Sequence, residues 1–190
     1  MENEKIRGWH AVFADGTTHY LAVPQEVGET LSLEGPIKVC GNGLHIGHTA
    51  LETLEILYWA TPLSASWLKP PVRLRRVELW GDLVGDAQKH KVAGRHRKVL
   101  WEVGPEKLVL LLHQHLSQWA TLKGWSEEHI RDIGQVADMD VSGEMWLERL
   151  HCMLHVLVFD VRVGNGGRTS RIEEFDKALL ALEPKEEAYV

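Results

Sequence analysis

The sequence has little cysteine and no long apolar run. Its 2 cysteines, Cys40 and Cys152, are too few for a disulfide framework and are typical of a reducing compartment. No segment approaches the roughly 18 apolar residues that a membrane-spanning helix requires, and the N-terminus MENEKIRGWH lacks the apolar core of a signal peptide. We therefore expect a cytoplasmic protein that has no membrane partner.

Motifs of common enzyme classes are also missing. There is no Gly-x-Ser-x-Gly nucleophile elbow, and the turn GNGG at 164–167 precedes Arg168 instead of the Gly-Lys-Ser/Thr of a phosphate-binding loop. The 11 histidines include four on apolar segments: His113, His115, His151 and His155. In the last pair, spaced i, i+4, Cys152 stands where a metalloprotease has glutamate. We expect no metal, and stoichiometric zinc in protein purified without a chelating tag would contradict this.

Negative charge is concentrated in the second half of the chain. The net charge is −6; residues 1–105 carry 12 basic and 12 acidic side chains, whereas residues 106–190 carry 9 and 15. Seven carboxylates are candidates for one acidic face: Glu127, Glu128, Asp132, Asp138, Asp140, Glu144 and Glu148. Such a face repels nucleic acid and suits a basic protein partner, although net charge also keeps an ordinary protein in solution.

One cluster of basic residues stands out, in KHKVAGRHRK at 89–98. Its charged members are Lys89, Lys91, Arg95, Arg97 and Lys98. Two interpretations stay open. The cluster is suited to hold a phosphate or pyrophosphate, and lysines also protect a solvated strand edge from aggregation.

Alternating apolar and polar residues predict short strands in the first half. The segments are GWHAVF at 8–13, THYLAV at 18–23, PIKVC at 36–40, VRLRRVELWGDLV at 72–84 and RKVLWEV at 97–103. A Gly-Asn-Gly turn leads into a further short strand that carries His45. A helix is predicted over 48–60, where Thr49 and Glu52 form the Ser/Thr-x-x-Glu capping box.

The second half is predicted to be mainly helical. The helical segments are 105–125, with Pro105 in the first turn, 126–138, 144–161 and 170–183, with Ser170 as the cap. The segment 144–161 is either one long apolar helix or a helix that runs into a strand. The predicted fold is α+β, with a small β-rich N-terminal lobe at 1–104 followed by a mainly helical, acidic C-terminal part at 105–190. The two parts form either two lobes or one single domain.

Residues 8–103 contain a series of short motifs, at 9–13, 27–31, 37–45, 51–54, 77–81 and 89–91. In order, these are an aromatic first strand, Val-Gly-x-x-Tyr/Leu, Ile-x-x-Cys-x-x-Gly-Phe/Leu-His, a helix, Val-Glu-x-x-Gly and a strand with lysine. With this series the segment resembles a family of small uncharacterised phage and prophage proteins. The resemblance implies an origin in a mobile element and brings no known activity with it.

The run GNGLHIGHTALETLEILY at 41–58 resembles, more weakly, the Gly-x-Gly-Ile-Tyr-Phe segment and following helix of the ADP-ribosyltransferase superfamily. In that superfamily a first-strand His or Arg, an aromatic residue or His after the glycines, and a late-strand Glu together grip NAD. The resemblance implies His10, His45 and Glu78 for these roles, with His45 replacing the usual tyrosine. A small ligand is expected in an aromatic-lined pocket near Trp9 and Trp80, which are close in the sequence to His10 and Glu78. Lys89 and Arg95 of the basic cluster are the other candidate ligand-binding residues.

Three functional hypotheses follow. The leading one is a phage- or prophage-encoded counter-defence protein of the anti-CRISPR type, which binds a host nucleoprotein complex through the acidic face in the cytoplasm of the infected or lysogenic bacterium. It requires no cofactor and no direct contact with nucleic acid. The first alternative is an NAD-dependent ADP-ribosyltransferase that modifies a host protein. The second is a non-enzymatic accessory protein that dimerises through the apolar helix 144–158.

Overall fold

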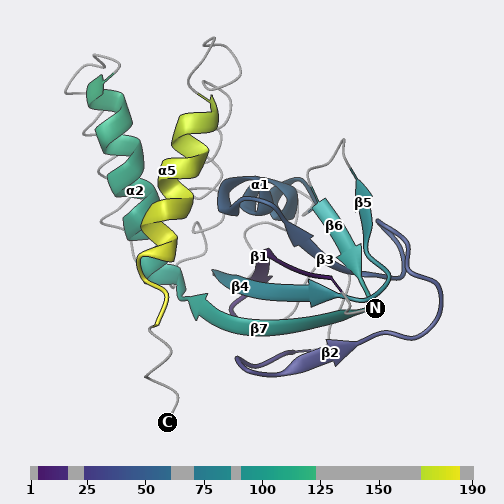
Figure 1. Ribbon diagram of the computed structural model, residues 1–190. Coiled ribbons are helices and arrows are strands. Elements are labelled where there is room, and N and C mark those ends of the chain that lie inside the picture. Colours follow the sequence, from purple (N-terminus) through teal and green to yellow (C-terminus); the bar gives the residue numbers. More distant parts are fainter. Residues whose placement is uncertain (1–3, 17–23, 61–70, 87–90, 123–167, 185–190) are drawn as a thin grey trace.

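The computed structural model describes residues 4–16, 24–60, 71–86, 91–122 and 168–184, which form a seven-stranded sheet and three helices (Figure 1). The strands are β1 (Lys5–Phe13), β2 (Thr30–Ser32), β3 (Leu44–Gly47), β4 (Val72–Trp80), β5 (Val84–Asp86), β6 (Lys91–Gly94) and β7 (His96–Val103). The helices are α1 (Ala50–Ala60), α2 (Pro105–Leu122) and α5 (Arg168–Leu180).

The sheet has the strand order β2-β7-β4-β1-β3-β6-β5, and all neighbouring strands are antiparallel. Long ladders join β1 to β4 and β4 to β7, whereas β1 and β3 share the single register pair Trp9 and Gly47. In Figure 1, β3, β6 and β5 lie beside α1, while β4, β7 and β2 lie below it. The sheet is therefore weakly joined in its middle, between β1 and β3.

A bulge in β7 distributes its side chains between two hydrophobic clusters. The register with β4 passes from the pair Arg76–Trp101 to the pair Val77–Val99, so Leu100 is an extra residue on β7. Residues two apart on a strand normally share a face. Trp101, however, packs in the larger cluster with the helices, and Val99 packs in a smaller cluster on the sheet. The bulge thus turns the first half of β7 away from the helices.

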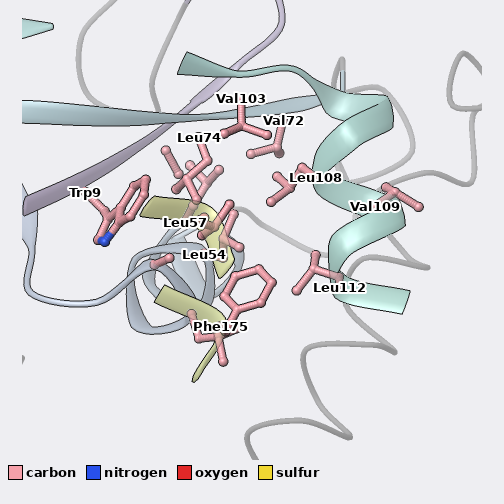
Figure 2. Close-up of a cluster of buried hydrophobic side chains, with 14 of the residues drawn as sticks. Trp9, Leu54, Leu57, Val72, Leu74, Val103, Leu108, Val109, Leu112 and Phe175 are labelled. Atoms are coloured by element: carbon pink, nitrogen blue, oxygen red, sulfur yellow. The ribbon is translucent and has the colours of Figure 1, made fainter. Parts of the chain in front are cut away.

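The larger cluster joins all three helices to the sheet (Figure 2). The side chains that converge there come from β1, α1, β4, β7, α2 and α5 and include Trp9, Leu54, Leu57, Leu74, Val103, Leu108, Leu112 and Phe175. Each of these side chains is at most 8% exposed. Burial of this apolar surface is the main force that holds α2 and α5 in place.

The prediction of a mainly helical C-terminal part is wrong. Among the described residues, the sheet continues to Val103, and α2 and α5 pack on β4, β7 and α1 as part of one core. The physical reason is that the apolar sides of α2 and α5 are covered by the sheet, so that these helices do not form a lobe of their own. The predicted segments 126–138 and 144–161 lie outside the described residues.

Most local predictions that fall on described residues are confirmed. The strands β1 and β7 and the helices α1 and α2 form where the patterns indicate, and β4 forms the first 9 residues of the strand predicted at 72–84. The capping box is present, because the Glu52 N–H donates to Thr49 Oγ1 at 3.3 Å and Thr49 Oγ1 donates to Glu52 Oε2 at 2.8 Å. The predicted strand at 18–23 lies outside the described residues.

Two local predictions need correction. The segment 36–40 is a loop, closed by a hydrogen bond from Lys38 N to Asn42 O at 2.8 Å, and the strand begins only at Leu44. None of the described strands lies beside this segment to pair with its backbone. The last helix begins at Arg168, two residues before the predicted cap Ser170, a difference within the usual uncertainty of helix ends.

Candidate functional site

A cavity of about 320 Å³ lies where β1 and β3 part, and residues of α1 line part of its wall. This volume is at the lower end of the usual range for small-molecule sites. The walls come from β1, β3, α1, the loop 40–43, β6 and β7, and their polar members include His10, His45, Cys40, Thr53, Lys91 and Arg97. Residues from distant parts of the sequence thus meet in one place.

Gly47 sets the distance between β3 and α1 at the back of this cavity. A β carbon on Gly47 would lie 2.0 Å from Thr53 Oγ1. Thr53 cannot easily move away, because its hydroxyl donates to Thr49 O at 2.7 Å within the first turn of α1. Glycine is therefore required for this close approach, which fixes one wall of the cavity.

The two histidines of the cavity are uncharged at neutral pH. Burial, together with the nearby charges of Arg97 and Arg75, lowers the pKa of His10 well below the ordinary value of 6.5. Burial, Lys91 and Arg97 lower the pKa of His45 from 6.5 to about 4. His45 Nε2 accepts a hydrogen bond from the Cys40 N–H at 3.0 Å, as a neutral imidazole does. Among the described residues, none bonds to the buried Nδ1 atom of His10.

Arg97 is a buried cation in the cavity wall. It is 4% exposed; its Nη1 donates to His45 O at 3.2 Å, and its Nε and Nη2 donate to Gln25 Oε1 at 3.4 and 3.2 Å. Burial, with the charge of Arg75, lowers its pKa to about 9, so it stays charged at neutral pH.

Arg97 has no carboxylate partner within the part of the chain that the structure describes. Arg75, equally buried, does have one, because its Nε lies 3.0 Å from Glu102 Oε2. Buried charges in proteins are normally paired, since an unpaired charge pays the full cost of desolvation. A negatively charged ligand in the cavity would supply the missing partner.

Lys91 and Cys40 complete the polar lining. The Nζ atom of Lys91 lies 3.0 Å from Cys40 Sγ. Cys40 has a left-handed backbone conformation, with φ of 59°, which costs a non-glycine residue roughly 1–2 kcal/mol. None of the residues that line the cavity is an aspartate or a glutamate. The cavity is thus a positively charged site.

The residues implied by the transferase resemblance are only partly brought together. Trp9, His10 and His45 line the cavity, but Glu78 does not. Glu78 pairs with Lys5 at 2.8 Å and with Arg7 at 3.7 Å. The register of β1 with β4 explains this, because it sets Arg7 directly opposite Glu78, where opposite charges stabilise the ladder.

Two of the predicted ligand-binding residues lie outside the cavity. Trp80 stacks on His96 with ring centroids 5.4 Å apart, and Lys5 Nζ lies 4.9 Å from the Trp80 ring centre. Arg95 pairs with Asp82 and donates to the carbonyl oxygens of Leu33 and Gly35. These contacts tie the loop 33–35 to the β6–β7 connection. Lys89 lies outside the described residues.

The predicted acidic face and half of the histidine set also lie outside the described residues, between 127 and 155. On α2, His113 Nε2 lies 3.4 Å from Ser117 Oγ, and the His115 ring centroid lies 5.5 Å from that of Phe175. In the described ranges, no three metal-ligating side chains come together. Nor is any described helix both long and apolar enough to cross a membrane.

Several residues of the site escape a reading of the sequence alone. Gln25 carries no motif. The lysine that contacts the Cys40 sulfur is Lys91, 51 residues away in the sequence, and the nearby Lys38 does not indicate this contact. The basic cluster at 89–98 did contain a signal, since its members Lys91 and Arg97 line the cavity. Alternation places Arg97 and Lys98 on opposite faces of β7, but it does not tell which of the two faces meets the cavity.

Comparisons of this chain with protein-family models, with curated proteins and with solved structures found no match.

Proposed function

We propose that this protein binds a small organic anion in the cavity, a ligand of the nucleotide class to which NAD and ADP-ribose belong. The observation that carries the proposal is Arg97, a buried guanidinium that lines the cavity and lacks a carboxylate partner among the described residues. Phosphate or carboxylate oxygens are the natural acceptors for such a group. Lys91 adds a second positive charge to the lining of the cavity.

The remaining lining favours a flat ring beside the anion. Trp9, Ile56 and Leu57 supply apolar and aromatic surface, while the neutral imidazoles of His10 and His45 supply hydrogen-bonding nitrogens. A mostly apolar pocket with a few convergent polar groups is typical of small-molecule sites. A cavity of about 320 Å³ accommodates one half of a dinucleotide, a ring with its ribose and adjoining phosphate.

Binding is favoured over ADP-ribosyl transfer by the position of Glu78. Transfer requires a carboxylate near the positively charged centre that forms when the nicotinamide leaves, and no aspartate or glutamate lines the cavity. Glu78 is instead engaged with Lys5 and Arg7. We infer that NAD, if it is the ligand, is bound without being cleaved by the three residues His10, His45 and Glu78.

Calorimetric titration with ADP-ribose, NAD and nicotinamide tests the proposal. We expect the two anions to bind and uncharged nicotinamide to bind much more weakly. Lys91→Gln should weaken ADP-ribose binding roughly tenfold, because a charge-assisted hydrogen bond is worth about 1.5–3 kcal/mol before solvent screening. Glu78→Gln is the matched control and should bind as the native protein does. Equal losses in both variants, or no binding of either anion, would contradict the proposal.

The pH dependence of the same titration tests the state of the histidines. A histidine with an ordinary pKa of 6.5 gains a positive charge on acidification to pH 5.5 and strengthens anion binding. Because the pKa of His45 is about 4 and that of His10 is also lowered, we expect constant affinity from pH 8 to 5.5 and an increase only toward pH 4. A rise centred near pH 6.5 would show that these imidazoles titrate normally.

A second proposal rests on the charge of the sequence. Residues 106–190 carry 15 acidic and 9 basic side chains. This negative charge supports the hypothesis that the protein is a counter-defence inhibitor, which binds a basic host nucleoprotein complex in the bacterial cytoplasm. We expect immobilised protein to retain such a complex at low salt and to release it at high salt. Replacing Glu127 and Glu128 by glutamine should weaken retention. If no specific host component is retained at low salt, this proposal is wrong.

A further inference from the structure

The thiol of Cys40 lies at the opening of the cavity beside a fixed positive charge. Cys40 is exposed and also lines the cavity. The distance from its Sγ to Lys91 Nζ is 3.0 Å. An ammonium group next to a cysteine sulfur stabilises the thiolate, which is the nucleophilic form of the side chain.

Backbone hydrogen bonds hold this thiol in position. The Cys40 N–H donates to His45 Nε2 at 3.0 Å, and the loop is closed by bonds from Lys38 N to Asn42 O at 2.8 Å and from Gly41 N to Lys38 O at 3.2 Å. The left-handed conformation of Cys40, with φ of 59°, persists because these bonds determine it. The sulfur is therefore kept close to Lys91.

A second observation points to a ligand at the same place: the buried Nδ1 atom of His10, which lines the cavity, has no hydrogen-bond partner among the described residues. The buried guanidinium of Arg97 lines the cavity and has no carboxylate partner among the described residues. His45 connects it to the thiol, because its carbonyl oxygen accepts from Arg97 and its ring accepts from Cys40. Arg97 and Cys40 are thus both hydrogen-bonded to His45, the first through its backbone carbonyl and the second through its ring.

We propose that Cys40 is a site of covalent modification by carbon electrophiles that carry a carboxylate or a phosphate. This inference rests on the proposed anion-binding function of the same cavity. Arg97 and Lys91 hold the anionic group while the thiolate attacks the neighbouring carbon. With iodoacetate, the carbon–sulfur bond forms as the carbon–iodine bond breaks, iodide leaves with the bonding electron pair, and a carboxymethyl thioether remains.

Alkylation rates with a charged and an uncharged reagent test the proposal. In a Cys152→Ser background Cys40 is the single thiol, and the rates of iodoacetate and iodoacetamide are followed by intact-protein mass spectrometry. The reference is the same protein unfolded in urea, where the cavity is absent. We expect the iodoacetate-to-iodoacetamide rate ratio to be at least about tenfold higher in the folded protein, since clefts of one charge concentrate counter-ions by that order.

Two further measurements test whether the charge of Lys91 and the anion site determine this reactivity. Lys91→Gln should move the ratio toward that of the unfolded chain, and saturating ADP-ribose should protect Cys40 from iodoacetate. Equal ratios in folded and unfolded protein would overturn the modification site. If calorimetry then still shows anion binding, the proposed function stands without it; if calorimetry shows none, both fail.

Discussion

Replacement of Phe175 by alanine is expected to lower the free energy of unfolding by about 3–5 kcal/mol. Phe175 is fully buried on α5, and Figure 2 shows its ring among side chains of α1 and α2, including Leu54 and Leu112. Truncation removes this apolar contact and leaves a cavity that the surrounding helices fill only in part. Urea unfolding, followed by circular dichroism, measures the change.

The matched control for this change is Leu180→Ala. Leu180 lies on the same helix but is 37% exposed, so its truncation should alter stability by no more than about 0.5 kcal/mol. The comparison also tests the fold itself. If Phe175→Ala costs as little as the control, then α5 does not belong to the core that it shares with the sheet.

Replacement of Arg97 by methionine is expected to weaken ADP-ribose binding at least about 30-fold. Removing one partner of a buried charge contact typically costs about 2–5 kcal/mol, and each 1.4 kcal/mol is a factor of ten in affinity. Methionine has a similar length and no charge, so the cavity keeps its shape and loses its anion-binding group. Calorimetry on protein that shows a cooperative urea transition measures the effect.

Two other variants distinguish the effect of removing the Arg97 charge from the effect of a general loss of structure. Arg73→Met removes an arginine of the same sheet that pairs with Glu102 at 3.1 Å and does not line the cavity, and its ADP-ribose affinity should remain native. Arg97→Lys keeps the charge and should recover part of the binding energy. If Arg97→Met binds ADP-ribose as tightly as Arg73→Met, the cavity is not the anion site.

The strongest predictions from sequence concerned single elements. The helix α1 forms where its 3.6-residue pattern and the pair Thr49 and Glu52 indicate, because a capping box depends only on neighbours along the chain. The strands β1, β4 and β7 follow from alternation for the same reason. The segment 36–40 has a similar pattern and is a loop, since pairing with another strand is not a local property.

The meeting of residues from different strands is decided only by the tertiary structure. An extra residue at Leu100 turns Arg97 to the side of the sheet away from the helices, and a single register pair between β1 and β3 leaves the gap in which the cavity forms. Neither a bulge nor the end of a ladder is visible in the alternation of one strand.

The sequence by itself determined which residue types were available. These are His10 on the first predicted strand, His45 after the Gly-Asn-Gly turn, and the basic cluster at 89–98. Only the tertiary structure decided their roles. It placed Lys91 and Arg97 with His10 and His45 around one cavity. It also left Glu78 outside the cavity, because the antiparallel register of β1 and β4 places Glu78 opposite Arg7 and within reach of Lys5. Long-range register, set by the packing of the whole sheet, determines which charges become neighbours.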